Sequence, residues 1–110
     1  MSEGSSKPGW TLLTNHARVL ICIAGDSTIR LRDVGARVGI TERAAHRIIT
    51  ELLAADYITR TRNGRRNEYT VNQDLPLRDP FARSQKLGDL LAVLLHPGTS
   101  PEDSLGVEHA

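Results

Sequence analysis

The dipeptide Asn63-Gly64 constrains the fold of this chain more than any other feature, because it separates two runs rich in Thr, Tyr and Arg. A type I′ turn needs two residues that tolerate positive φ, and Asn-Gly is the strongest short-range signal for a β-hairpin. Residues 57–62 alternate as a strand does, and residues 65–71 return as a second strand. The facing pairs that this turn predicts are Ile58 with Tyr69, Arg62 with Arg65, and Thr61 with Arg66.

A first helix is predicted well before the hairpin. Thr14 and Asn15 can cap it, and its apolar run covers residues 17–24 before Gly25 and Asp26 end it. Nearly every face of this short helix is apolar. We therefore expect it to be well buried, partly against another chain.

Two further helices, joined by a short turn, are predicted directly before the hairpin. Gly39 stops the first of them in the role of a left-handed C-terminal residue, and Thr41 caps the second, which runs from about 42 to 55. The apolar residues at helical spacing are Leu31, Val34 and Val38 in the first, and Ala45, Ile48, Ile49 and Leu52 in the second.

A last helix is predicted over roughly 82–96, after Pro76 and Pro80 break the chain. Like the first helix, it is apolar on more than one face, and a small domain can cover only one of them. We therefore expect a two-fold homodimer in which both terminal helices form the interface. The expected interface residues are Val19, Ile23, Leu87, Leu90, Leu91, Leu94 and Leu95.

The 110 residues divide into one domain and two polar ends. Residues 1–9 and the acidic segment 97–110 are expected to be disordered, which leaves 10–96 as the single folded domain. The single Cys22 excludes an internal disulfide framework and is expected to be a small buried apolar side chain, while His16 is expected to cap or flank the first helix.

Several functional classes lack their sequence signals. No apolar stretch is long enough to span a membrane, and the N-terminus lacks the apolar core of a secretory signal, so we expect a cytoplasmic protein. Four scattered histidines and one cysteine make no metal set. No nucleophile–base pair, phosphate loop or dinucleotide motif is present. We therefore expect no enzyme activity, no metal and no cofactor.

The charge is unevenly distributed along the chain. Residues 30–66 carry nine basic residues, all of them Arg, against four acidic ones, a net charge of +5, and the remainder carries −4. The guanidinium group is a rigid fork that matches phosphate groups and guanine edges. The middle of the chain is therefore the candidate contact with a polyanion.

The order helix, turn, helix, Arg-rich hairpin is that of a winged helix-turn-helix. The segment LRDVGARVGITERAAHRIITELLAADYI resembles the helix-turn-helix of the MarR and ArsR groups of bacterial regulators, including small actinobacterial-type ones, and ITRTRNGRRNEYTV resembles their wing. The resemblance covers about half of the chain, residues 13–71. It implies a mainly α fold with a small β-hairpin wing (α+β), a C-terminal dimerisation helix and sequence-specific binding of double-stranded DNA by a homodimer. The chain is short for MarR and lacks the paired cysteines of metal-sensing ArsR proteins.

The second helix of a helix-turn-helix lies in the major groove, where all four base pairs can be distinguished. Its outward face is expected to carry the DNA contacts, with Arg43, His46 and Arg47 as the base-reading candidates. Thr41 would cap the helix and reach phosphate, and Glu42 suits the charge at a helix N-terminus. The recognition-helix candidates are Thr41, Glu42, Arg43, His46, Arg47 and Thr50.

The wing is the second candidate contact. Three arginines crowd its turn, and like charges opposite one another destabilise a hairpin, whereas a neighbouring polyanion would explain them. They could bind phosphate or enter the minor groove, where the potential is most negative at narrow A·T tracts. The wing candidates are Arg62, Asn63, Gly64, Arg65, Arg66 and Asn67.

Three functions remain open on the sequence. The leading hypothesis is a homodimeric transcriptional regulator that binds an inverted-repeat operator. The alternatives are a winged helix that binds another protein without sequence-specific DNA binding, and a non-specific nucleic-acid-binding protein. The sequence identifies no operator and no small-molecule effector, and it leaves room for such an effector.

Overall fold

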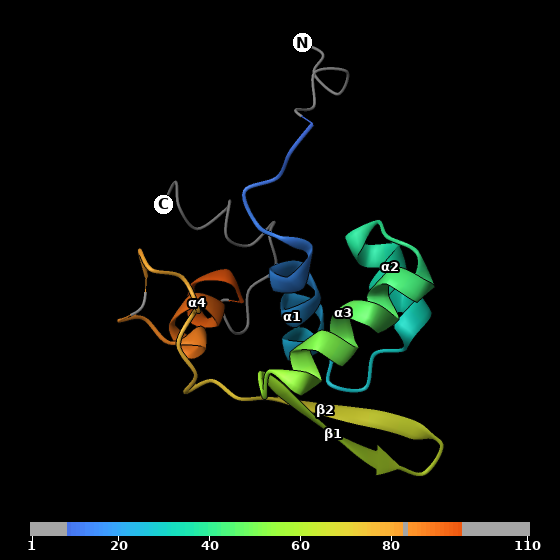
Figure 1. Ribbon diagram of the computed structural model, residues 1–110. Helices are drawn as coiled ribbons and strands as arrows, with labels where there is room; N and C mark the ends of the chain where they lie inside the picture. Colours follow the sequence, from blue (N-terminus) through green and yellow to red (C-terminus); the bar gives the residue numbers. More distant parts are fainter. Residues whose placement is uncertain (1–8, 83, 96–110) are drawn as a thin grey trace, which may run out of the picture.

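The computed structural model of the chain describes residues 9–82 and 84–95. Its elements, in chain order, are α1 (Asn15–Gly25), α2 (Leu31–Val38), α3 (Glu42–Ala54), β1 (Ile58–Asn63), β2 (Arg66–Val71) and α4 (Leu87–Leu94). Figure 1 shows α1 in the middle, α2 and α3 on one side of it and α4 on the other, with the antiparallel hairpin below them. This is the predicted α+β winged helix-turn-helix, with β1 and β2 as the wing. The predicted disordered segments, 1–9 and 97–110, lie outside the described residues apart from Gly9.

The two predicted threonine caps are confirmed. The hydroxyl oxygen of Thr14 accepts a hydrogen bond from the amide of Ala17 at 3.1 Å at the start of α1. The hydroxyl of Thr41 does the same for the amide of Ala44 at 3.0 Å at the start of α3. Each cap satisfies one of the amides that the first turn of a helix leaves without a partner.

The turn between α2 and α3 depends on two glycines. Gly39 has φ +85° and ends α2 in the left-handed region, as the sequence predicts. Gly35 is buried inside α2, and a Cβ there would lie 2.8 Å from the carbonyl oxygen of Ile40. Because no real Cβ tolerates that distance to a backbone oxygen, Gly35 lets the turn pack directly against α2.

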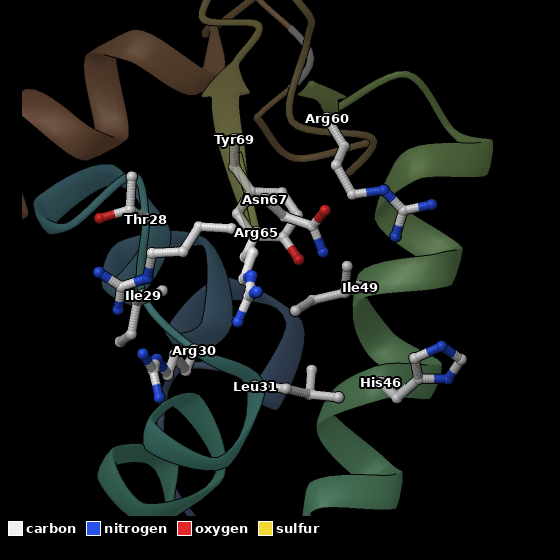
Figure 2. A pocket seen from close by; sticks show the side chains of 11 residues that line it. Thr28, Ile29, Arg30, Leu31, His46, Ile49, Arg60, Arg65, Asn67 and Tyr69 are labelled. Atoms are coloured by element: carbon white, nitrogen blue, oxygen red, sulfur yellow. The ribbon is translucent and has the colours of Figure 1, made fainter. Parts of the chain in front are cut away.

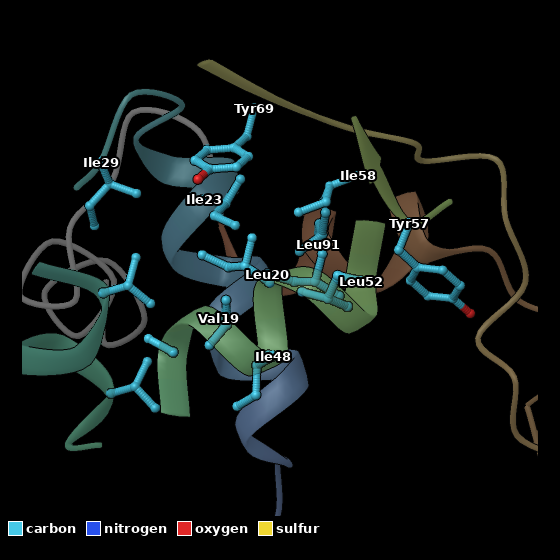
Figure 3. Close-up of a cluster of buried hydrophobic side chains, with 14 of the residues drawn as sticks. Val19, Leu20, Ile23, Ile29, Ile48, Leu52, Tyr57, Ile58, Tyr69 and Leu91 are labelled. Carbon is cyan, nitrogen blue, oxygen red and sulfur yellow. The ribbon is translucent and has the colours of Figure 1, made fainter. Parts of the chain in front are cut away.

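The hydrophobic core runs between the helices and the base of the wing (Figure 3). The predicted stripe of α3 supplies Ala45, Ile48, Ile49 and Leu52, each at most 5% exposed. Val19 and Ile23 of α1 and Leu87 and Leu91 of α4 are buried, each at most 4% exposed. These four side chains, predicted as dimer contacts, are therefore already covered within one chain and leave little surface for a partner.

The register of the hairpin differs from the prediction. Asn63 pairs with Arg66, so the two-residue loop is Gly64-Arg65 rather than Asn63-Gly64. Gly64 alone in this loop has positive φ, at +67°, and a type II′ turn requires positive φ only at its first central residue. Ile58 therefore faces Val71, Arg62 faces Asn67 and Thr61 faces Glu68.

The last helix is shorter than predicted, since α4 begins at Leu87 rather than near residue 82. The preceding residues are paired with another part of the chain. The amide of Leu87 donates to the carbonyl of Leu75 at 2.8 Å, and Pro76 and Lys86 form an isolated antiparallel bridge. Asp89 then accepts from the amide of Lys86 at 3.0 Å, which caps the helix start. The predicted end at residue 96 lies outside the described residues.

Candidate nucleic-acid interface

The face of α3 opposite its buried stripe is exposed along its whole length. The six predicted recognition-helix residues are all exposed: Thr41, Glu42, Arg43, His46, Arg47 and Thr50. Their exposure follows from the helical period, because Ala45, Ile48, Ile49 and Leu52 turn the other face into the core. The helix therefore presents a continuous polar surface that includes two arginines and a histidine.

Besides the Thr41 cap, two of these polar side chains interact within the protein. The Thr50 hydroxyl donates to the carbonyl of His46 at 2.9 Å. Arg47 lies one turn before Glu51, with 3.5 Å between Nη1 and Oε2, and its side chain remains 63% exposed. The long distance and the exposure make this a weak ion pair, so the guanidinium stays available to a stronger acceptor.

Glu51 also joins α3 to α1. Nε2 of His16 donates to Oε1 of Glu51 at 2.6 Å, so His16 bridges two helices rather than simply flanking α1. This hydrogen bond is the main cause that lowers the pKa of Glu51; desolvation opposes it, and the charge of Arg47 adds a smaller lowering effect. Glu51, which the sequence did not single out, therefore stays ionised beside the exposed polar face of α3.

The wing carries its charges at the tip. Arg62, Asn63, Gly64, Arg65 and Arg66 are exposed, and Asn67 is half-buried. Nε of Arg62 donates to the carbonyl of Gly64 at 3.2 Å. In the observed register no arginine stands directly opposite another, so the predicted facing of Arg62 with Arg65 is wrong. Three arginines still lie within five residues around a tight turn.

A cleft of about 520 Å³ separates the wing from the helices, and Figure 2 shows it from close by. Four arginines line it: Arg30 just before α2, Arg60 in β1, Arg65 in the turn and Arg66 in β2. Hereafter we call it the arginine cleft. Its other lining residues are Thr28, Ile29, Leu31, His46, Ile49, Asn67 and Tyr69. His46 connects the cleft to the exposed face of α3.

Sequence reasoning did not place Arg30 or Arg60 at the site. Arg60 could have been found from the alternation of β1, since side chains two residues apart share one face of a strand. Ile58 is buried against the core, so Arg60 lies on the same face and nearer the tip. No local pattern places Arg30, because it reaches the cleft only through the packing of α2 against the rest of the fold.

A second cleft, of about 370 Å³, lies between α1, the end of α3 and the chain around α4. Its lining is mostly apolar, from Leu20, Leu52, Leu77, Leu87 and Leu90, with His16, Glu51 and Arg78 as charged or titratable groups. Beside it, the hydroxyl of Tyr57 donates to the carbonyl of Pro76. Burial raises the pKa of Tyr57, so this hydroxyl remains a donor at neutral pH.

Cys22 lies away from both clefts and is half-buried against the core rather than fully enclosed. Burial raises the pKa of its thiol, although Arg37 and Arg18 act in the other direction. Within residues 9–82 and 84–95 we find no group of three or more His, Cys, Asp or Glu side chains arranged to hold a metal ion. None of the helices there has the length and apolar character needed to cross a membrane.

The remaining predicted dimer residues lie on α4 or directly after it. Leu90 and Leu95 are half-buried and Leu94 is 38% exposed. Val93 was not among the expected interface residues, yet it is 75% exposed beside Leu94. The outer face of α4 thus presents a small apolar patch, formed by Val93 and Leu94.

The chain was compared with known proteins. No protein-family model matches it, and no curated protein is significantly similar to it in sequence. Among solved structures it is similar to the PcaV transcriptional regulator from Streptomyces coelicolor, whose crystal structure is in complex with its natural ligand. The two share 20% sequence identity over 96% of this chain and 75% of that chain, with a TM-score of 0.48. Similarity at this level assigns neither a family nor a function to this chain.

Proposed function

We propose that this protein is a transcriptional regulator that binds double-stranded DNA in a sequence-specific manner. The observation that carries the proposal is the adjacency of two exposed basic surfaces, the outer face of α3 and the tip of the wing. An α-helix fits the major groove of B-DNA, and a basic hairpin beside it can reach the flanking backbone or the minor groove. If α3 were only a solvated surface helix, its exposure would not explain the second cluster of arginines at the wing tip beside it.

In this proposal α3 reads the bases. Arg43, His46 and Arg47 lie on its exposed face within its N-terminal half, which is the part that enters the groove. An arginine pairs bidentately with guanine, and each such pair contributes about 1–3 kcal/mol of discrimination against the wrong base. Thr41 contacts a phosphate while it caps the helix, and Glu42 and Thr50 border the contact.

The wing supplies affinity without sequence preference. Arg62, Arg65 and Arg66 bind phosphates or the edge of the minor groove, with Asn63, Gly64 and Asn67 shaping the tip. The register supports this role, because the arginines are not opposed in pairs and can spread along a DNA strand. Phosphate contacts position a protein on the duplex but carry no sequence information themselves.

We propose further that the regulator is a homodimer on an inverted-repeat operator. The apolar patch formed by Val93 and Leu94 supports an interface along α4, with Leu90 and Leu95 at its border. A two-fold dimer places two recognition helices one helical turn of DNA apart. This interface is smaller than the one expected from the sequence, because Val19, Ile23, Leu87 and Leu91 are enclosed within one chain.

The test of the dimer is the mass in solution at micromolar concentration. Replacing Val93→Glu and Leu94→Glu should give monomers, because two carboxylates would be buried without partners at the interface. The matched control, Ser84→Glu with Gln85→Glu, adds the same charge at exposed positions before α4 and should leave the mass at two chains. A wild-type mass of one chain would overturn the dimer.

The test of DNA binding is a selection of bound duplexes from a random pool, followed by titrations at fixed salt. A regulator should bind the selected duplex at least about 10³-fold more tightly than random DNA. Equal affinity for both would indicate non-specific nucleic-acid binding. The absence of binding to any duplex would favour the alternative, a winged helix that binds another protein.

A further inference from the structure

The arginine cleft is concave, which distinguishes it from the exposed surfaces of α3 and the wing tip. Its arginines come from separate parts of the chain: Arg30 precedes α2, and Arg60, Arg65 and Arg66 belong to the hairpin. Figure 2 shows Arg65 of the wing on the side of the start of α2, where Arg30 lies, while Arg60 lies beside α3. A group inside the cleft can therefore meet guanidinium groups from more than one side.

The positive charge of the cleft is not neutralised by its own walls. The lining contains no Asp or Glu. Within the described part of the chain, Arg30, Arg60, Arg65 and Arg66 form no ion pair and no side-chain hydrogen bond, whereas Arg47 has Glu51 as a neighbour. Hollows with charge of one sign and low-dielectric walls concentrate the electric field. The cleft should therefore attract anions more strongly than the same charges on a convex surface.

The floor of the cleft is apolar. Ile29, Ile49 and Tyr69 are buried beneath it, each at most 7% exposed, and Leu31 is half-buried at its edge. Guanidinium groups above an apolar floor suit a ligand with anionic oxygens and a less polar body, such as a phosphate ester. The volume of about 520 Å³ exceeds that of a single ion and lies within the range of ligand sites, roughly 300–1,000 Å³.

We infer that the arginine cleft is a phosphate-binding site, with Arg30 and Arg60 as ligand-binding residues besides those of the wing tip. Guanidinium groups bind phosphate oxygens through pairs of charge-assisted hydrogen bonds, which are the strongest type available to a side chain. Two sources offer this chemistry: the phosphates of a DNA backbone that passes between α3 and the wing, and a free phosphate compound. For the first source, the inference rests on the proposed function.

The experiment compares two double variants of the full chain. In the cleft variant, Arg30→Gln and Arg60→Gln remove two guanidinium groups from the cleft. In the control, Arg32→Gln and Arg37→Gln remove the same charge from exposed positions of α2 that do not line the cleft. Circular dichroism serves as the control that both variants remain folded. Each protein is then titrated with inorganic pyrophosphate, and with the duplex selected for the wild type over a range of salt concentrations.

If backbone phosphate occupies the cleft, the cleft variant should bind the duplex at least tenfold more weakly than the control. The slope of log K against log[salt] should also be smaller in magnitude, by about 2, for the cleft variant than for the control. If a free phosphate compound occupies the cleft, the two variants should bind the duplex equally, and the cleft variant alone should lose pyrophosphate binding, by about tenfold or more.

The inference is overturned if the cleft variant and the control agree in both titrations. That result differs from a failure of the proposed function. If the wild type binds no duplex at all, the regulator proposal falls, while loss of pyrophosphate binding in the cleft variant alone still supports the site. If the wild type binds its duplex and both variants match each other throughout, the regulator proposal stands and the cleft has no role in binding phosphate.

Discussion

The third helix and the wing both carry arginines, but the protein holds them in different ways. The side chains of α3 project from a helix whose opposite face is locked into the core by Ala45, Ile48, Ile49 and Leu52. In β1 only Ile58 is buried, and the five residues after it are exposed. Backbone pairing with β2, rather than side-chain packing, therefore holds the wing tip in place.

This difference suggests a division of labour. Reading bases requires donors held in fixed positions, because a bidentate contact with a base edge tolerates little displacement. Binding phosphates requires charge and reach, because the backbone looks alike at every step. The rigid scaffold of α3 suits the first task, and the exposed tip of the wing suits the second.

The largest effect should come from loosening the scaffold of α3. Replacing Ile48→Ala removes a side chain that is 2% exposed and should lower the free energy of unfolding by about 2–5 kcal/mol. The matched change in the wing, Thr59→Ala, affects an exposed side chain and should stay within about 0.5 kcal/mol. Urea unfolding measures both, and equal losses would remove the contrast between the two regions.

The next effect should come from discharging the wing. Changing Arg62, Arg65 and Arg66 to Ala should weaken binding to selected and random duplexes alike, by about 100-fold at 0.1 M salt, and reduce the salt slope by about 2–3. Anisotropy titrations over a range of salt concentrations measure this change. A shift in base preference with unchanged affinity for random DNA would show that the wing reads sequence.

A smaller and more specific effect is expected in α3. Arg47→Ala should relax the preference at one base pair of each half-site and cost about 1–3 kcal/mol of discrimination. Its affinity for random DNA should fall much less than that of the wing variant. Repeating the selection with the mutant measures this effect directly, and an unchanged motif would exclude Arg47 from the base-reading residues.

The smallest effect concerns Glu51, whose carboxylate accepts hydrogen bonds from both His16 and Arg47. Its pKa lies below the ordinary value of 4.5, so the ionised form is favoured in the folded chain. The resulting stability is present above the unfolded pKa and is lost as the pH falls through the folded pKa. Glu51→Gln should therefore be slightly less stable than the wild type at neutral pH, and the difference should vanish in acid. A difference independent of pH, measured by thermal unfolding, would contradict this account.

The sequence predicted the helices near the site well because their ends depend on local signals. Thr14 and Thr41 cap the starts of α1 and α3, and Gly39 ends α2. Each does so through contacts with residues only a few positions away in the sequence. The start of α4 was missed because the residues before it pair with Leu75 and Pro76, and no local pattern reveals such pairing.

The register of the wing shows a different limit. Gly64 can take the second central position of a type I′ turn or the first of a type II′ turn. The two registers differ by two residues, so the same side chains face the core in both and the hydrophobic pattern cannot choose between them.

The apolar character of α1 and α4 has a similar ambiguity, since it predicts burial but does not say whether the same chain or a partner provides the cover. Likewise, the arginine cleft exists only once α2 and the hairpin have come together.

The attachment of the wing has a consequence for the cost of binding. The amide of Tyr69 in β2 donates to the carbonyl of Ser27 at 2.8 Å, and this bond ties the hairpin to the segment that leads into Arg30. The two walls of the arginine cleft are thus joined at the backbone before any ligand arrives. Little conformational entropy is then lost in bringing them together, so more of the attraction between guanidinium and phosphate remains as affinity.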